Sequence, residues 1–371
     1  MFLALRELRA AKGRFALMGC VVVLIAALVG IVSGFTTGLG DDTVSALRRL
    51  PATHIAFSGD ARTDQFARSL VDSRTAAGWG AEKGVQATPM GVSITRGSTG
   101  RGVPVDLAAF GVDPGSFLAP RVESGAGLRP GGDGVVISRQ IADDGVRVGD
   151  TIVIDRLGIR LPVLGVTGRS SYGHVPVGYM PLGTWQRIRF SVPGAAGAGA
   201  APPGQYSAVA LRAGGGAVLG AADERLGTRT LARDEAFAAA PGYSGERITM
   251  NSILLFLYLI APLVVGAFFA VWTVQRQPEL ALLRALGAAR RRLLAHTLVQ
   301  AATVVVASTL VGAGLAAGAG LALGSAVPFS LPLTTLLGTV AAVTAAGLAG
   351  TALTLRRVTS ADPLTMLGGN R

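Results

Sequence analysis

Few residues in this chain of 371 residues have the types and spacing that catalysis or nucleotide binding requires. Lys12 and Lys83, the two lysines, each precede a glycine, so neither completes the Gly-rich loop that cradles nucleotide phosphates through Lys-Ser or Lys-Thr. No serine stands in the Gly-x-Ser-x-Gly context of a nucleophile elbow, and no His-Glu-x-x-His segment occurs. The sequence therefore predicts no catalytic residues and no ATP site of its own.

Residue types that bind metals are scattered. His54, His174 and His296 show no metal-ligand spacing. Cys20, the only cysteine, lies in an apolar run, so no intrachain disulfide can form, and packing against lipid or a neighbouring helix is favoured over reactivity. We predict no metal site.

The segment Glu279–Ala289 has a pattern suited to function. Its leucines form one apolar face, and Arg290, Arg291 and Arg292 follow it. Two interpretations stay open. The segment could be a short helix that docks into a groove of a partner, or an interfacial helix that only turns the chain around.

Long apolar runs must position this segment. A helix that crosses about 30 Å of hydrocarbon needs about 20 apolar residues, and four runs meet that requirement. The sequence predicts transmembrane helices at 15–36, 251–274, 293–323 and 333–355. The segments around them are predicted as an amphipathic interfacial helix at 1–14, an inserted domain at 37–250, a cytoplasmic helix at 275–292, an outer turn at 324–332 and a cytoplasmic tail at 356–371.

Charge supports this topology. Hydrophobic residues make up 50% of the chain and charged residues 15%, below the roughly 25% of soluble domains. The net charge is +12, yet residues 37–250 are nearly balanced, with 22 basic and 19 acidic residues. The other basic residues flank apolar runs on one side, which is the positive-inside pattern and not a groove for nucleic acid. Both termini are therefore predicted to be cytoplasmic and the insert to lie outside.

The N-terminal run has a second interpretation. A basic start before an apolar run is typical of a signal peptide, but this run exceeds the usual 7–15 residues of such a core, and three more spans follow. We expect an uncleaved anchor.

The insert reads as a mixed α+β domain, because short β-like runs alternate with Gly and Pro. Strands are predicted at 53–57, 91–95, 103–110, 134–138, 151–154, 159–166 and 207–211, helices at 64–71, 217–226 and 233–239, and a flexible loop at 193–203.

Glycine spacing in the third span suggests close helix packing. Gly314 and Gly318 are four residues apart, as are Gly320 and Gly324. The general abundance of Gly and Ala is the alternative explanation.

The segment Glu279-Leu-Ala-Leu-Leu-Arg-Ala-Leu-Gly-Ala288 resembles the E-[IL]-x-[LV]-L-[RK]-A-[LI]-G-A signature of FtsX/MacB-type ABC transporter permeases. The start Ala4-Leu-Arg-Glu-Leu-Arg9 and the end Asp362-Pro363-Leu364 resemble the termini of that family. Gly145-Val-Arg-Val-Gly-Asp150 and Tyr179-Met-Pro-Leu182 resemble its extracytoplasmic domain.

This resemblance implies a multi-pass protein of the bacterial plasma membrane. It implies a homodimer of permeases in the lipid bilayer, with ATP bound by a separate ABC ATPase subunit and no covalently held cofactor. The expected coupling residues on that ATPase are Glu279, Leu280, Leu283, Arg284, Leu286 and Gly287. Gly287 also suits a helix C-cap.

Length and the N-terminal sequence also resemble the permease of Gram-positive haem exporters, which implies haem as the substrate. Glu246, Met250 and Tyr258 lie at the start of the second span, on or near one helical face, and their types can ligate haem iron or contact its edge. Their ordinary roles are a helix-start glutamate, a packing methionine and an interfacial tyrosine.

The resemblance thus favours an ABC exporter subunit for an amphipathic substrate, with haem first. Two alternatives stay open: an FtsX-like mechanotransmitter that signals to a cell-wall enzyme outside, and a lone receptor without an ATPase.

Overall fold

The computed structural model describes residues 12–61, 65–155, 157–191, 204–214, 218–275, 290–324 and 327–360. The chain divides into two compact units. Residues 1–39 and 247–371 form the membrane unit, and residues 40–246 form the inserted unit.

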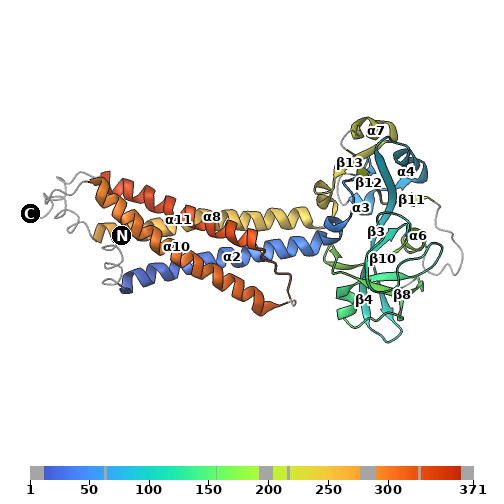
Figure 1. Ribbon diagram of the computed structural model, residues 1–371, viewed down its shortest axis with the longest axis horizontal. Helices are drawn as coiled ribbons and strands as arrows, with labels where there is room; N and C mark the ends of the chain where they lie inside the picture. Colours follow the sequence, from blue (N-terminus) through green and yellow to red (C-terminus); the bar gives the residue numbers. More distant parts are fainter. Residues whose placement is uncertain are drawn as a thin grey trace, which may run out of the picture. The chain divides into compact units, whose positions relative to one another are not determined.

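The membrane unit contains four helices long and apolar enough to cross a membrane, which confirms the predicted number of spans for the described part of the chain (Figure 1). These helices are α2 (Lys12–Arg49), α8 (Tyr243–Gln275), α10 (Arg290–Leu323) and α11 (Leu333–Ser360).

Two helices exceed the predicted apolar runs. Helix α2 continues past position 36 to Arg49, and α8 begins at Tyr243 before position 251. The apolar run shows only which residues lie in the hydrocarbon core of the membrane. The helix itself can continue beyond that core, because its backbone hydrogen bonds do not depend on apolar side chains. Residues 40–49 and 243–246 are therefore helical and belong to the inserted unit.

Small residues let the spans approach closely. A Cβ at Gly312 of α10 would collide with Ala26 and the Val23 carbonyl of α2, and one at Gly350 of α11 would collide with the Pro262 backbone of α8. In lipid there is no hydrophobic driving force between helices, so such close approach supplies the contact energy.

The predicted contact glycines are partly wrong. Nothing in the described chain lies within contact distance of a Cβ at Gly314 or Gly318. The glycine and alanine that meet α2 are Gly312 and Ala316, which lie two residues away and so about 200° around the helix.

The turn between α10 and α11 packs against α2. A Cβ at Gly34 or Gly320 would collide with the Phe329 ring, and one at Gly38 would collide with the Pro328 carbonyl. Phe329 also meets Phe35 edge-on, with ring centroids 5.4 Å apart, and the Ser330 amide donates to the Gly34 carbonyl at 3.0 Å. The close contacts of Pro328 and Phe329 and one backbone hydrogen bond therefore hold the turn against α2.

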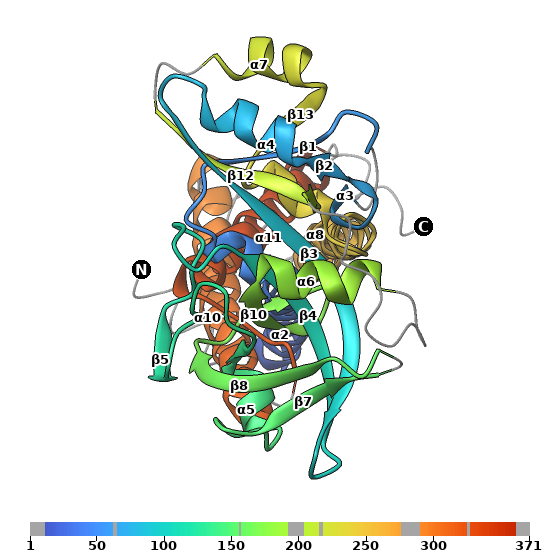
Figure 2. The same cartoon turned by 90° about the vertical axis from the view of Figure 1, so that its right-hand side faces the viewer.

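The inserted unit is built on an 11-stranded mixed sheet with the order β13-β1-β12-β3-β4-β10-β6-β8-β5 (Figure 2). Strand β7 pairs with β3 and β8, β9 pairs with β10, and β11 pairs with β2 in a separate ribbon. The strands are β1 (His54–Ser58), β2 (Val71–Asp72), β3 (Val85–Thr99), β4 (Pro104–Val112), β5 (Val122–Gly125), β6 (Val135–Ser138), β7 (Thr151–Ile154), β8 (Arg160–Thr167), β9 (Ser171–Tyr172), β10 (Val175–Pro181), β11 (Gln205–Tyr206), β12 (Ala208–Ala213) and β13 (Thr228–Ala232).

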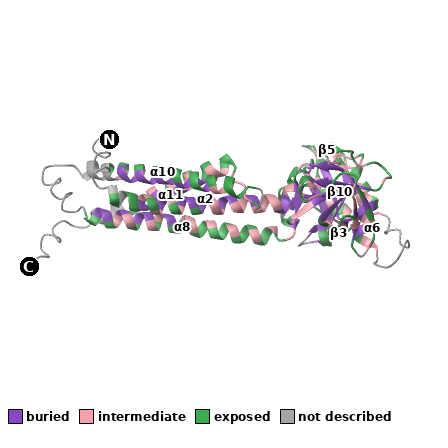
Figure 3. Cartoon of the chain, turned by 90° about the horizontal axis from the view of Figure 1, so that it is seen from below, coloured by how far each residue is buried: buried purple, intermediate pink, exposed green. Residues whose placement is uncertain are grey.

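Short helices cover this sheet: α3 (Gln65–Arg68), α4 (Ser73–Gly80), α5 (Arg139–Asp143), α6 (Leu182–Phe190), α7 (Leu219–Leu226) and the 3-10 helix η1 (Glu235–Ala239). Strand β3 joins the two halves of the sheet, because β12 pairs with its first part and β4 with its second part. The indole of Trp185 on α6 covers Gly91 and Gly111, which face each other on β3 and β4, and a Cβ at either glycine would collide with it. Buried residues concentrate in this core, whereas the spans expose apolar residues along their length (Figure 3).

Several local predictions need correction. The predicted helix at 64–71 is only α3, and Val71 belongs to β2. The segment at 233–239 is helical only from Glu235, as a 3-10 helix. Strand β10 was not predicted, because its Pro176 and Pro181 are unfavourable in a strand, yet it lies between β4 and β6.

Candidate functional site

The candidate site is built around a two-residue turn. Tyr172 pairs with Val175, so Gly173 and His174 form the turn between β9 and β10. Both residues have positive φ, 58° at Gly173 and 63° at His174. His174 is the only non-glycine residue with positive φ in the described part of the chain. This region of backbone conformation favours glycine and, after it, Asn, Asp and His.

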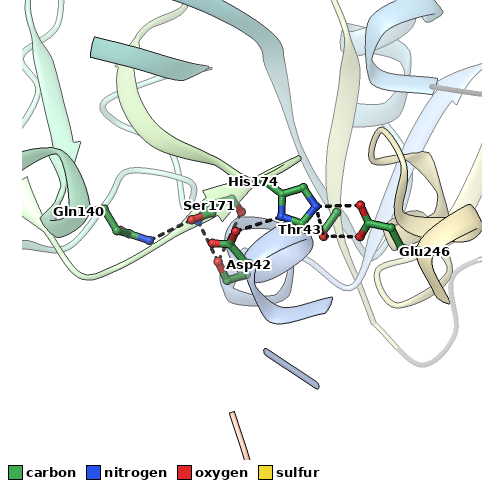
Figure 4. Close-up of polar contacts among 7 residues, drawn as sticks. Asp42, Thr43, Gln140, Ser171, His174 and Glu246 are labelled. Atoms are coloured by element: carbon green, nitrogen blue, oxygen red, sulfur yellow. Dashed lines mark hydrogen bonds and ion pairs between the residues drawn. The ribbon is translucent and has the colours of Figure 1, made fainter. Parts of the chain in front are cut away.

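The His174 imidazole lies between two carboxylates (Figure 4). Its Nδ1 is 3.0 Å from Asp42 Oδ2 on α2, and its Nε2 is 2.8 Å from Glu246 Oε1 on α8. We refer to Asp42, Thr43, His174 and Glu246 as the clamp.

Thr43 completes the clamp. Its hydroxyl donates to Glu246 Oε2 at 3.1 Å and lies 3.3 Å from His174 Nε2. Its carbonyl accepts a hydrogen bond from the Gly173 amide at 2.9 Å. The clamp therefore connects three segments that are far apart in sequence: the end of α2, the β9–β10 turn and the start of α8.

Charge strengthens the clamp. An imidazole with a carboxylate at each nitrogen is best satisfied when both nitrogens carry protons and donate. Partial burial lowers the pKa of His174, but the hydrogen bonds and charges of Glu246 and Asp42 outweigh it, so the pKa is raised above its ordinary value. The clamp thus favours imidazolium over neutral imidazole.

A second polar group lies beside the clamp. Ser45, one turn after Asp42 on α2, accepts a hydrogen bond from the Ser171 amide at 2.8 Å, and the Gln140 side-chain amide donates to Ser171 Oγ at 2.9 Å (Figure 4). Gln140 Oε1 in turn accepts from the Ser170 amide at 3.0 Å. The last turns of α2 are therefore bonded to the β9–β10 hairpin at several points.

Of the three predicted substrate-contacting residues, Glu246 lies in the clamp, where its side chain is 31% exposed. Met250 is half-buried one turn further along α8. Tyr258 packs against a cluster formed by Ala26, Val29 and Val343 of the membrane unit. Glu246 belongs to the inserted unit, and Met250 and Tyr258 belong to the membrane unit.

Asp42, Thr43 and His174 were not predicted as partners of Glu246. The available signal was weak: Gly173 lies between β-like residues, but Gly-His is not one of the usual pairs of a two-residue hairpin turn. The predicted coupling residues, from Glu279 to Gly287, lie outside the described residues.

The described residues contain no group of His, Cys, Asp or Glu side chains arranged to hold a metal ion. In the clamp the imidazole stands between the carboxylates, so its donors face the acids and not a common point. The arrangement can hold, orient or release a carboxylate.

Comparison with known families identifies the class of protein. Residues 15–229 match the MacB-like periplasmic core domain, and residues 251–363 match the FtsX-like permease C-terminal domain. The chain belongs to the FtsX/MacB-type ABC transporter permeases. It is a multi-pass membrane protein with an α+β periplasmic core domain between its first and second spans, and such a permease works with an ATPase partner.

Two curated relatives match over their whole length. The putative hemin transport system permease protein HrtB of Staphylococcus haemolyticus (strain JCSC1435) is 23% identical over 371 residues, which covers 100% of this chain and 99% of the relative. The protein of the same name from Staphylococcus epidermidis (strain ATCC 12228 / FDA PCI 1200) is 20% identical over 375 residues, with 100% of both chains covered.

Two solved structures are also similar. The periplasmic region of MacB from Actinobacillus actinomycetemcomitans is 14% identical, with a TM-score of 0.36, and the match covers 52% of this chain and 92% of that one. The extracellular domain of the transporter YknZ from Gram-positive bacteria is 14% identical, with a TM-score of 0.34, and the match covers 48% and 98%.

Proposed function

We propose that this chain is the permease of an ABC exporter that moves haem out of the bacterial plasma membrane, driven by a separate ATPase. The observation that carries the proposal is the whole-length similarity to two relatives named for hemin transport. The sequence is consistent with this proposal, because it contains no phosphate-binding loop, so the ATP of the proposed exporter would be hydrolysed by a partner.

The proposed coupling element is the segment 279–288, seated on the ATPase. Its apolar face would pack into a groove of the partner, with Glu279 and Arg284 at its polar edge and Gly287 at its end. The one-sided arginines support cytoplasmic N and C termini, which puts this segment on the same side as the ATPase. Two permeases would form a homodimer above two ATPase subunits.

The proposed transport step follows from this arrangement. ATP binding closes the ATPase dimer, the segments at 279–288 move with it, and the four-span bundles tighten and expel haem outward. Glu246, Met250 and Tyr258 are the proposed contacts for haem, since carboxylate, thioether and phenol groups are known ligand types for its iron. Haem is the cargo here and is not a resident cofactor.

Vesicle transport tests the proposal. Inside-out vesicles that contain the complex with its ATPase should accumulate hemin in the lumen only when ATP is present. The Gly287→Val variant should insert normally and hydrolyse ATP, but its hemin accumulation should fall to the level without ATP. Gly338→Val is the matched control, because nothing in the described chain lies within contact distance of a Cβ at Gly338.

Each part of the proposal can fail separately. Hydrolysis without any hemin movement by the wild type would exclude haem as cargo. Normal hemin movement by Gly287→Val would exclude 279–288 as the coupling element.

A further inference from the structure

His174 has a backbone conformation that is uncommon for a residue other than glycine. A two-residue turn with positive φ is built most easily from Gly or Asn, because most side chains crowd the backbone there, although His adopts this conformation more often than most residues. Such an outlier persists when contacts elsewhere compensate for it, and outliers of this kind cluster at functional positions. The compensating contacts here are the two carboxylates that the imidazole reaches.

Glu246 is consequently engaged through both of its oxygens. Oε1 faces His174 Nε2 at 2.8 Å, and Oε2 accepts from the Thr43 hydroxyl at 3.1 Å. The His174 imidazolium and the ferric iron of hemin are both cations, and both can bind the Glu246 carboxylate. The carboxylate is a weaker ligand for iron while the imidazolium neutralises part of its charge.

We propose that His174 is a positioning residue that competes with the substrate for Glu246, so that hemin must displace the imidazole to bind this carboxylate. The inference rests on the proposed function, in which Glu246 contacts haem. It adds a step to that function, in which Glu246 on α8 is released from His174 on the β9–β10 turn before it binds hemin.

The release step links substrate binding to the fold. When His174 leaves Glu246, the hydrogen bond between the start of α8 and the β9–β10 turn through these two side chains is lost. The imidazole still reaches Asp42, and Thr43 still reaches Glu246, so the end of α2 stays bonded to both of the other segments. Occupancy of Glu246 thus decides whether His174 bonds the turn to α8 as well as to α2.

The test is a hemin titration of the purified complex, followed by the Soret absorbance. Asn tolerates positive φ, so His174→Asn keeps the turn while it removes the bridge between the carboxylates. We expect His174→Asn to bind hemin about tenfold more tightly than the wild type, or about 1.4 kcal/mol. In a Glu246→Gln background the same change should have no effect, because the contested carboxylate is gone.

Controls make the result specific. His54 is the matched control, since among the described residues its ring has a hydrogen bond only with the neighbouring Thr53 hydroxyl, and His54→Asn should bind hemin as the wild type does. If His174→Asn does not fold, His174→Gly replaces it, because glycine accepts a φ of 63° without strain.

The outcomes separate the two claims. Hemin binding by the wild type with unchanged or weaker affinity in His174→Asn overturns the competition and leaves the proposed function intact. An equal gain in the Glu246→Gln background also overturns it, because the effect would then not pass through Glu246. No hemin binding by the wild type overturns the proposed function and this inference together.

Discussion

The membrane unit and the inserted unit differ in how their helices and strands meet. The core of the inserted unit is filled by large side chains such as Trp79, Trp185 and Phe110, all fully buried. The spans also bury some large side chains, among them Phe269 and Trp272, but they approach one another most closely at glycines, at Gly30, Gly312 and Gly350. Water provides a hydrophobic driving force for filling a core, whereas lipid provides none between helices, so close backbone approach takes its place.

This difference predicts which substitutions destabilise each unit most. The inserted unit should respond most to volume that is removed, because a cavity in a filled core stays partly open. The membrane unit should respond most to volume that is added at a close approach.

Removal of Trp185 should have the largest effect. Its indole is fully buried over Gly91 and Gly111, and its Nε1 donates to Ser93 Oγ at 3.1 Å. We expect Trp185→Ala to destabilise the inserted unit by about 3–5 kcal/mol. Denaturant unfolding of the full chain in detergent measures this. Leu321→Ala in the membrane unit, where the leucine is 86% exposed, should cost far less, and an equal loss would break the contrast.

Addition of one methyl group to α2 should have the next largest effect. A Cβ at Gly38 would meet the backbone of Pro328 and Phe329, which cannot move aside as a flexible side chain can. We expect Gly38→Ala to destabilise the membrane unit by roughly 1–2 kcal/mol, after the better helix propensity of alanine is counted.

Gly338→Ala provides the comparison for that change, because its Cβ would enter open space in the described chain and should be neutral or slightly stabilising. If thermal unfolding shows equal shifts for Gly38→Ala and Gly338→Ala, the close approach of the turn to α2 contributes nothing.

The smallest effect should come from the clamp, and it should depend on pH. The pKa of His174 is raised in the folded chain, so its stabilising contribution is complete below the unfolded value of about 6.5 and is lost as pH rises through the folded value. We expect the melting temperature of the wild type to exceed that of His174→Asn at about pH 6 and to converge with it by about pH 9.

Melting curves of the two proteins in detergent measure that difference. The exposed pair of Arg96 and Asp106 offers a control, and Asp106→Asn should show no convergence over the same pH range. A constant difference between wild type and His174→Asn across this range would show that the clamp does not favour the imidazolium.

The sequence predicted those features that depend on local patterns. The composition shows four apolar runs and one insert with balanced charge. Strands such as β7 and β8 are predicted from short runs of Val, Ile and Leu between turns. The capped helix α4 had a local signal too, since Asp72 accepts from the Thr75 amide at 2.8 Å, but this signal was missed.

The clamp could not be predicted in the same way. His174 is 132 positions from Asp42 and 72 from Glu246, so no periodicity connects them. Glu246 was selected for its type and its place before a span, whereas its partners depend on the β9–β10 turn and on the continuation of α2 beyond the apolar run. Sequence patterns report which residues face a core, and the pairing of distant polar groups follows only from the sheet topology.

The most direct test of the proposed function is the ATPase activity of the purified permease–ATPase complex, titrated with hemin. We predict that hemin stimulates hydrolysis, and that the triple variant Glu246→Gln, Met250→Leu, Tyr258→Phe keeps basal activity but loses the stimulation. A flat response of the wild type, with basal activity intact, would contradict haem as the substrate, although the chain would remain a permease of this family.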